Sequence, residues 1–306
     1  MNIAWPRTER APDMKLECIA PAKINLALHV IGRRTDGYHL LESLVAFAAF
    51  GDRLSVEKAE ADTFLLAGPF RDGLEGSGNF VLNARDLLRE KFASRASSPV
   101  AITLEKNLPV ASGIGGGSSD AATGLKLLTR YWEIETEPAE LAQIGLGLGA
   151  DVPMCLFGQP LIASGIGEKL EPVSTLPSLP ILLVNPGLPL ATPAVFSSLV
   201  ERENAPLPPA PRNKSAAELV NWLRLTRNDL EPAALSIMPV IGIVLRLLQT
   251  EGALIARMSG SGATCFGIFE TASKARQAGE MISRRHPGWF VRATQTRASM
   301  PELSHV

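Results

Sequence analysis

Residues 109–119, with the sequence Pro-Val-Ala-Ser-Gly-Ile-Gly-Gly-Gly-Ser-Ser, have a composition suited to binding phosphate. Four of these residues are glycine and three are serine. They lie between residues 100–104, which are typical of a strand, and residues 120–128, which are typical of a helix. Glycine lets backbone N–H groups approach an anion closely, and a helix start adds unpaired N–H donors and a favourable dipole. We therefore predict a phosphate-binding turn at 109–119.

This glycine-rich turn matches neither of two common phosphate motifs. A P-loop requires a lysine after its last glycine, and none follows Gly117. A Rossmann turn requires a third glycine where this chain has Ser118, and an acidic residue near a second strand, whereas Glu140 lies past the predicted helix. A flexible linker is the remaining alternative, but linkers seldom sit tightly between a strand and an apolar helix.

Three other segments contain small and polar residues that a hydrophobic core does not need. Lys23 and Asn25 share one face of a predicted strand, because strand side chains alternate, although a solvated lysine is the alternative. Asp151 follows a helix-ending glycine and could orient and deprotonate a hydroxyl, or simply satisfy turn amides. Residues 259–262, Ser-Gly-Ser-Gly, form either a second phosphate-sized turn or a β-hairpin turn. Together these parts suggest a nucleotide kinase without a P-loop.

Size and composition favour a globular enzyme. The 306 residues suit about two domains, and a hydrophobic content of 46% can form a sizeable core. The net charge of −1 offers no broad basic surface, so we expect no nucleic-acid partner. No apolar run reaches membrane-spanning length, and residues 1–14 resemble a loose tail without a signal core, so we expect a cytoplasmic protein without a membrane partner. The three separated cysteines form neither a metal motif nor a disulfide framework, which favours a reducing compartment.

Strand and helix patterns mix throughout the chain, which predicts an α+β fold. Helical spacing occurs at 80–92, 120–128, 138–148, 237–248 and 272–284. Strand patterns occur at 16–20, 24–31, 53–57, 63–66, 100–104, 161–163, 179–184, 253–258, 265–269 and 289–293. Residues 38–50 are mostly apolar and should be buried, whereas the proline-rich residues 203–214 should form an exposed loop.

The two glycine-rich segments resemble motifs of the galactokinase, homoserine kinase, mevalonate kinase and phosphomevalonate kinase (GHMP) superfamily. The turn at 109–119 resembles its phosphate-binding motif, and residues 259–264 resemble its C-terminal glycine motif. More narrowly, four segments resemble the kinases of 4-diphosphocytidyl-2-C-methyl-D-erythritol, namely residues 21–28, 34–39, 149–153 and 228–231. The similarity extends from about residue 16 to 293, with the motifs in the expected order.

This resemblance implies transfer of the γ-phosphoryl group of ATP to the 2-hydroxyl of that cytidine diphosphate-linked methylerythritol, a step of the non-mevalonate route to isoprenoids. The implied fold has two GHMP kinase domains, residues 1–168 and 169–306, with the active site in the cleft between them. ATP chemistry implies Mg²⁺, whose protein ligands stay open, with Ser118 or Ser119 as candidates. The implied partner is a small-molecule substrate, and the chain would be a monomer or a homodimer.

The resemblance also implies roles for individual residues. Lys23 and Asp151 match the catalytic lysine and aspartate of the family. The residues of the glycine-rich turn would hold the phosphates of ATP: Pro109, Val110, Ala111, Ser112, Gly113, Ile114, Gly115, Gly116, Gly117, Ser118 and Ser119.

The cytidylyl substrate would occupy a separate part of the cleft. Asn25 would lie near the methylerythritol. Tyr38 and His39 would form the cytosine pocket, and Phe196 would close it from the other side.

Two alternative functions remain at this point. A sister kinase acting on homoserine or mevalonate would need no aromatic pocket for cytosine. A ligand sensor built on a retired kinase fold should have lost Lys23, Asp151 or the glycine-rich turn, and this chain retains all three.

Overall fold

The computed structural model describes residues 15–72, 74, 78–173, 176–209, 215–297 and 304–305, and the tail expected at 1–14 lies outside them. The strands are β1 (Leu16–Arg33), β2 (His39–Lys58), β3 (Thr63–Ala67), β4 (Val100–Glu105), β5 (Leu161–Gly165), β6 (Lys169–Pro172), β7 (Pro180–Asn185), β8 (Ile255–Met258), β9 (Cys265–Ile268), β10 (Phe290–Arg297) and β11 (Ser304–His305). The helices are α1 (Phe80–Lys91), α2 (Gly116–Tyr131), α3 (Pro138–Leu148), α4 (Val152–Phe157), α5 (Thr192–Ser197), α6 (Ala216–Arg224), α7 (Glu231–Ile237), α8 (Val240–Thr250) and α9 (Ala272–Arg285).

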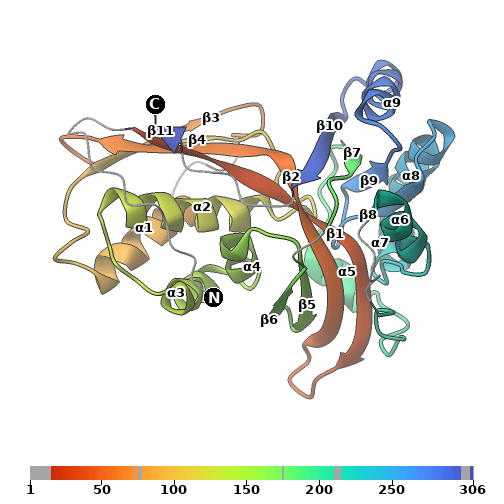
Figure 1. Cartoon of the computed structure of the whole chain (residues 1–306), viewed down its shortest axis with the longest axis horizontal. Helices are drawn as coiled ribbons and strands as arrows, with labels where there is room; N and C mark the ends of the chain where they lie inside the picture. The colour runs from red at the N-terminus through yellow and green to blue at the C-terminus, as the bar shows by residue number, and fades with distance from the viewer. Residues whose placement is uncertain are drawn as a thin grey trace.

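The long antiparallel hairpin of β1 and β2 crosses the molecule and joins its two halves (Figure 1). The main strand order is β11-β1-β2-β10-β7-β9-β8, and β2 additionally pairs with β4 and β5. The register of β1 against β2 shifts between Pro21 and Lys23 and again between Asn25 and Ala27. Such bulges re-aim side chains, so residues 21–27 of β1 do not follow simple alternation.

The N-terminal half packs helices against one face of the sheet. In Figure 1, α1 to α4 lie together beneath β1, β2 and β4. Helix α2 is buried along most of its length, and Leu125 and Leu128 pack in one core with Phe47 and Leu54 of β2. Burial of these large apolar side chains stabilises the arrangement by about 1.5–3 kcal/mol each. The core therefore fixes the helix that begins at the glycine-rich turn.

The C-terminal half is layered around β7, whose side chains alternate between two cores. Leu182 and Val184 pack with apolar residues of α8 and α9, whereas Ile181 and Leu183 pack in the core that also contains Leu223 of α6. This two-residue period is what a strand covered on both faces requires. Because β7 is packed on both faces and pairs with β9, which in turn pairs with β8, the connection between β8 and β9 is held in a fixed position.

Several expected boundaries were wrong. β1 runs through Pro21 without a break, because the missing proline N–H falls at a bulge, and β2 is one strand from 39 to 58. Within 38–50 only residues 43–48 are buried, and Tyr38 is 62% exposed. The helix expected at 237–248 is split, because Pro239 separates α7 from α8. The loop expected at 203–214 is confirmed for residues 203–209, which contain neither helix nor strand and are mostly exposed, and residues 210–214 lie outside the described residues.

Candidate active site

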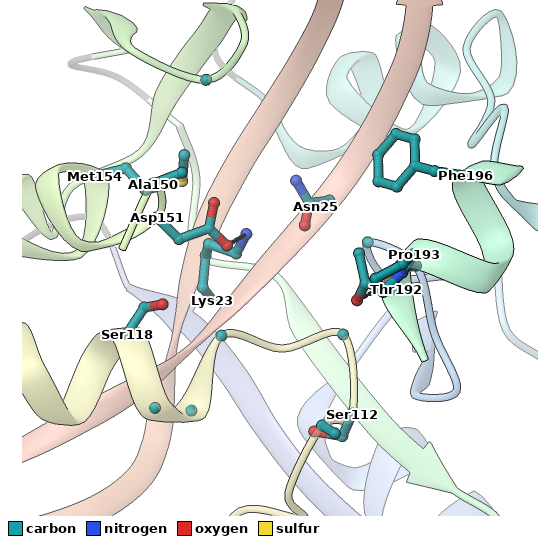
Figure 2. Close-up of a pocket in the computed structure, with 18 of the residues that line it drawn as sticks. Lys23, Asn25, Ser112, Ser118, Ala150, Asp151, Met154, Thr192, Pro193 and Phe196 are labelled. Carbon is teal, nitrogen blue, oxygen red and sulfur yellow. Dashed lines mark hydrogen bonds and ion pairs between the residues drawn. The ribbon is translucent and has the colours of Figure 1, made fainter. Parts of the chain in front are cut away.

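Lys23 and Asp151 meet in a cavity of about 1160 Å³, although 128 positions separate them in the sequence. The Nζ of Lys23 donates to Oδ2 of Asp151 at 2.6 Å, and Figure 2 shows the two side chains pointing toward each other. Lys23 is only 6% exposed, so its ammonium needs this partner. Asp151 precedes α4, as its N-cap residue, and keeps one side of its carboxylate open to the cavity.

The glycine-rich turn runs directly beside this ion pair. The backbone N–H of Lys23 donates to the carbonyl of Ile114 at 2.9 Å. Gly115 is the N-cap of α2 in a left-handed conformation, and a Cβ there would lie 3.1 Å from the Cβ of Lys23. Glycine at 115 therefore allows the close approach, and the unpaired N–H groups of the first turn of α2 begin next to the lysine.

The segment 259–264, here called the second turn, packs against the glycine-rich turn. A Cβ on Gly113 would lie 2.4 Å from the carbonyl oxygen of Ser259, so only glycine fits. Ser259 Oγ accepts from the backbone N–H of Asn25 at 3.1 Å and donates to the carbonyl of Gly113 at 2.9 Å. One serine hydroxyl thus joins β1, the glycine-rich turn and the second turn.

Asn25 presents a fixed acceptor at the cavity. Ser43 Oγ donates to the carbonyl of Ala27 at 2.7 Å, so it can only accept from Asn25 Nδ2, at 2.8 Å. This network orients the Asn25 amide and leaves its Oδ1 buried without a partner in the described residues. An orphaned buried acceptor costs free energy unless a ligand donates to it.

An aromatic cluster lies at another part of the cavity. The rings of His39 and Phe196 are 5.1 Å apart and tilted by 30°, and Tyr38 stands 62% exposed at the cavity lining. Burial, assisted by the positive charges of Arg33 and Arg202, lowers the pKa of His39. Its ring is therefore held in the neutral form, which can both donate and accept hydrogen bonds.

A buried charged triad lies beneath the first turn of α2. Lys106 Nζ donates to Asp52 and, at 2.5 Å, to Asp120, and all three residues are at most 3% exposed. The second oxygen of Asp52 accepts the backbone N–H groups of Asn107 and Leu108, immediately before the glycine-rich turn. Burial raises the pKa of Asp120 well above its usual range, with the charge on Asp52 adding to the effect and Lys106 opposing it.

The cavity collects nearly all of the site residues expected from the sequence. Lys23, Asn25, Tyr38, His39, Asp151 and Phe196 line it, with most of the glycine-rich turn. Ile114 and Ser119 do not line it: Ile114 is fully buried, and Ser119 is 1% exposed. Ser118, by contrast, faces the cavity from α2 (Figure 2).

Sequence reasoning missed several lining residues. Lys106 and Asp120 resemble ordinary surface charges in the sequence, and only their proximity to the glycine-rich turn could have identified them. Thr192 lies at the cavity and shares a 2.7 Å hydrogen bond with Ser261 of the second turn. The Thr-Pro pair at the start of α5 was the available signal, since such pairs often begin helices.

Two absences hold for the described part of the chain. No group of three or more histidine, cysteine, aspartate or glutamate residues there could hold a metal ion. None of its helices is both long and apolar enough to cross a lipid bilayer.

Comparisons with known proteins agree with this geometry. The model of the GHMP kinases N terminal domain matches residues 79–159, and that of the GHMP kinases C terminal region matches residues 209–288. A protein of Mesorhizobium japonicum named 4-diphosphocytidyl-2-C-methyl-D-erythritol kinase is 53% identical over 284 residues, covering 92% of this chain and 96% of its own length. A protein of the same name from Brucella melitensis is 58% identical over 277 residues, covering 89% of this chain and 92% of its own.

Solved structures extend the likeness to three dimensions. A crystal structure of 4-(cytidine 5'-diphospho)-2C-methyl-D-erythritol kinase matches with a TM-score of 0.76 and 35% identity, over 92% of this chain and 99% of that one. A homoserine kinase from Cytophaga hutchinsonii matches with a TM-score of 0.67 at 16% identity, over 98% of this chain and all of that one, which shows the shared fold. Because both family models match, and because the relatives are similar over almost their full length, this chain belongs to the 4-diphosphocytidyl-2-C-methyl-D-erythritol kinase family of the GHMP kinases.

Proposed function

We propose that this chain transfers the γ-phosphoryl group of ATP to the 2-hydroxyl of 4-diphosphocytidyl-2-C-methyl-D-erythritol, in the non-mevalonate route to isoprenoid precursors. The observation that carries the proposal is the 2.6 Å pair of Lys23 and Asp151, which shares one cavity with a glycine-rich turn and an aromatic cluster. The names of the relatives point to the same reaction. A homoserine or mevalonate kinase, or a retired sensor, is not favoured by these relatives.

In the proposed reaction, Asp151 orients the acceptor hydroxyl and takes its proton. The hydroxyl oxygen forms a bond to the γ-phosphorus, the bond from that phosphorus to the β–γ bridging oxygen breaks, and ADP leaves. Lys23 stabilises the negative charge on the Asp151 carboxylate and on the attacking oxygen. The proton then passes from Asp151 to solvent through the open side of its carboxylate.

The nucleotide phosphates would lie along the glycine-rich turn and the start of α2. Backbone N–H groups and the helix dipole there stabilise negative charge, which is the main requirement of phosphoryl transfer. Mg²⁺ usually binds such sites through substrate phosphates and few protein oxygens, and the hydroxyl of Ser118 fits this role because it faces the cavity. When bound, the ion would neutralise charge on the phosphates.

The cytosine of the substrate would stack on Tyr38, with Phe196 on the other side. The neutral ring of His39 has a buried Nε2 without a partner in the described residues, which suits recognition of a base edge. Asn25 Oδ1 would accept from a hydroxyl of the methylerythritol.

The function is tested by incubating the protein with ATP, Mg²⁺ and the cytidylyl substrate and recording the phosphorus NMR spectrum of the product. We expect one new phosphomonoester signal and stoichiometric ADP. Mevalonate and homoserine, offered in parallel, should give no product. Phosphorylation of either one, with none of the cytidylyl substrate, would replace this proposal with a sister activity.

Three further expectations stay predictions. A domain boundary near residue 168 is supported by the separate matches of the two family models on either side of it. A cytoplasmic location rests on the sequence arguments above, and a monomeric or homodimeric state is an expectation that those arguments leave open.

A further inference from the structure

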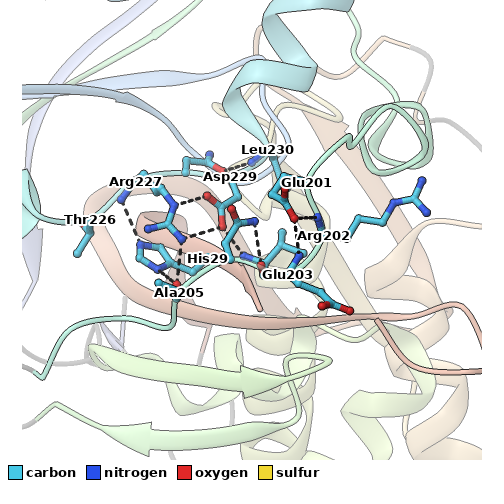
Figure 3. A network of polar contacts seen from close by, with 12 residues as sticks. His29, Glu201, Arg202, Glu203, Ala205, Thr226, Arg227, Asp229 and Leu230 are labelled. Carbon is cyan, nitrogen blue, oxygen red and sulfur yellow. Dashed lines mark hydrogen bonds and ion pairs between the residues drawn. The ribbon is translucent and has the colours of Figure 1, made fainter. Parts of the chain in front are cut away.

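The segment 227–231, Arg-Asn-Asp-Leu-Glu, has no part in the chemistry described so far, although most of it is one of the motifs that identify the family. It connects α6 to α7 and lies against β1, away from the main cavity apart from Leu230. Figure 3 shows its polar contacts with β1. On the side facing away from β1, the segment contacts the second turn.

Asn228 is the residue that touches the second turn. Its side chain is buried, and its Nδ2 donates to the carbonyl oxygens of Met258 and Gly260, both at 2.8 Å. Its Oδ1 accepts from the N–H of Leu230 at 3.0 Å. The Asn228 amide therefore uses both of its N–H donors and its carbonyl acceptor at once. No other side chain of this length has two donors and an acceptor on one planar group.

A second contact fixes the same place. The carboxylate of Glu231 accepts the N–H of Met258 at 2.8 Å. Met258 is therefore held at its N–H by Glu231 and at its carbonyl by Asn228, so the residue before the second turn has little freedom to move.

The other side of the segment is anchored to β1. Leu28 and residues 227–229 exchange two backbone hydrogen bonds of 2.9 Å, and Asp229 accepts the N–H of Val30 at 2.7 Å. The N–H of Arg227 donates to Nε2 of His29 at 3.2 Å (Figure 3). The segment is thus fixed to the strand that carries Lys23, while Asn228 holds the second turn.

From these contacts we infer that Asn228 is a positioning residue for phosphoryl transfer, which sets the second turn at the correct distance from the glycine-rich turn. Two hydrogen bonds connect Asn228 to the glycine-rich turn. Asn228 Nδ2 holds the carbonyl of Gly260 in the second turn, and the neighbouring Ser259 Oγ donates to the carbonyl of Gly113. Gly260 and Gly113 both line the main cavity. Loss of the Asn228 contacts would widen the phosphate site without touching the aromatic cluster. This inference rests on the proposed function for its kinetic readout.

The test is Asn228→Asp, which keeps the shape but replaces two donors by an oxygen that faces two carbonyls. We expect kcat per folded enzyme to fall about 10- to 100-fold, because small misplacements of reacting groups have effects of this size. The KM for ATP should rise, and the KM for the cytidylyl substrate should stay within about twofold, as for changes confined to one subsite. Asn228→Ser, with a single donor, should give an intermediate loss if the aspartate variant does not fold.

Asn204→Asp is the matched control. Asn204 Nδ2 also donates to a backbone carbonyl, that of Val30, at 3.1 Å, but among the described residues its hydrogen bonds reach neither turn. We expect this variant to lose stability in urea while keeping wild-type kcat and both KM values. If Asn228→Asp loses activity only in proportion to its unfolded fraction, or keeps wild-type kcat and KM for ATP, the inference is wrong.

Calorimetric titration with a non-hydrolysable ATP analogue separates this inference from the proposed function. A wild-type protein that binds the analogue but phosphorylates no cytidylyl substrate would refute the function alone. In that case, weaker binding by Asn228→Asp than by Asn204→Asp would still support the positioning role, and equal binding would refute it.

Discussion

The Lys23 ammonium and the Asp151 carboxylate form one ion pair, yet the lysine side chain is 7% exposed and the aspartate side chain 40%. The buried lysine lies against Gly115, the N-cap of α2, and its ammonium is directed to its partner. The carboxylate has room to meet an incoming hydroxyl. The carboxylate, and not the buried ammonium, is therefore the member of the pair that an incoming substrate can reach.

Tyr38→Ala should mainly raise the KM for the cytidylyl substrate. Stacking of a base on an aromatic ring contributes about 1–3 kcal/mol, so the increase should be roughly 5- to 150-fold. Because Tyr38 is exposed, the urea midpoint should not change. Steady-state kinetics with each substrate varied in turn will measure this, and a rise confined to the KM for ATP would place Tyr38 at the wrong subsite.

Asp120→Asn should stabilise the protein, increasingly so as the pH rises. Asp52, Lys106 and Asp120 together bring two carboxylates and one ammonium into the interior, and the folded-state pKa of Asp120 is raised by burial. A carboxyl group with a raised folded pKa supports folding below its unfolded pKa, and that support is lost as the pH rises through the folded pKa.

Urea unfolding of wild type and of Asp120→Asn at a series of pH values checks this sign. The two curves should converge near pH 4 and diverge above it, with the variant more stable. A variant that is less stable across the whole range would mean that the carboxylate, rather than its neutral form, is required by Lys106.

His29 should make stability fall on mild acidification. It is fully buried, its Nδ1 lies 2.9 Å from the carbonyl of Ala205, and its Nε2 accepts from Arg227. Burial lowers the pKa of His29, with the charge on Arg227 acting in the same direction and Asp229 opposing it. The unfolded chain therefore binds a proton at higher pH than the folded one, so stability is present above about pH 6.5 and is lost below it.

His29→Gln is the corresponding variant, since its amide offers both an N–H donor group and a carbonyl acceptor but does not titrate. Thermal unfolding should show a smaller loss of stability between pH 7 and 5 for this variant than for wild type. Identical pH profiles would show that another group governs acid sensitivity.

Much of the fold could be predicted from local pattern. α3 matches its expected range, because Pro138 and Gly149 mark its ends. The glycine-rich turn was predicted from its composition and its place between a strand and a helix. The structure places residues 109–115 between β4 and α2, whereas residues 116–119 already form the first turn of α2. What local pattern could not provide was the course of β1 through Pro21, since a bulge depends on the partner strand and not on the proline itself.

The site was less accessible to sequence reasoning than the fold. The pairing of Lys23 with Asp151 spans 128 positions and came from resemblance, because no periodicity links residues so far apart. Lys106 was missed because a buried lysine is recognisable only by its partners, which here come from β2 and α2. Asn228 was noticed as part of a motif, but its role depends on a turn 30 residues away.

The most direct measurement is the single-turnover rate of Asp151→Asn with ATP and the cytidylyl substrate, alongside calorimetric binding of that substrate. Loss of the general base should slow phosphoryl transfer by about 10²- to 10⁴-fold while binding of the cytidylyl substrate stays near wild type. A rate near that of the wild type would show that Asp151 only completes a turn, and that the hydroxyl is activated elsewhere.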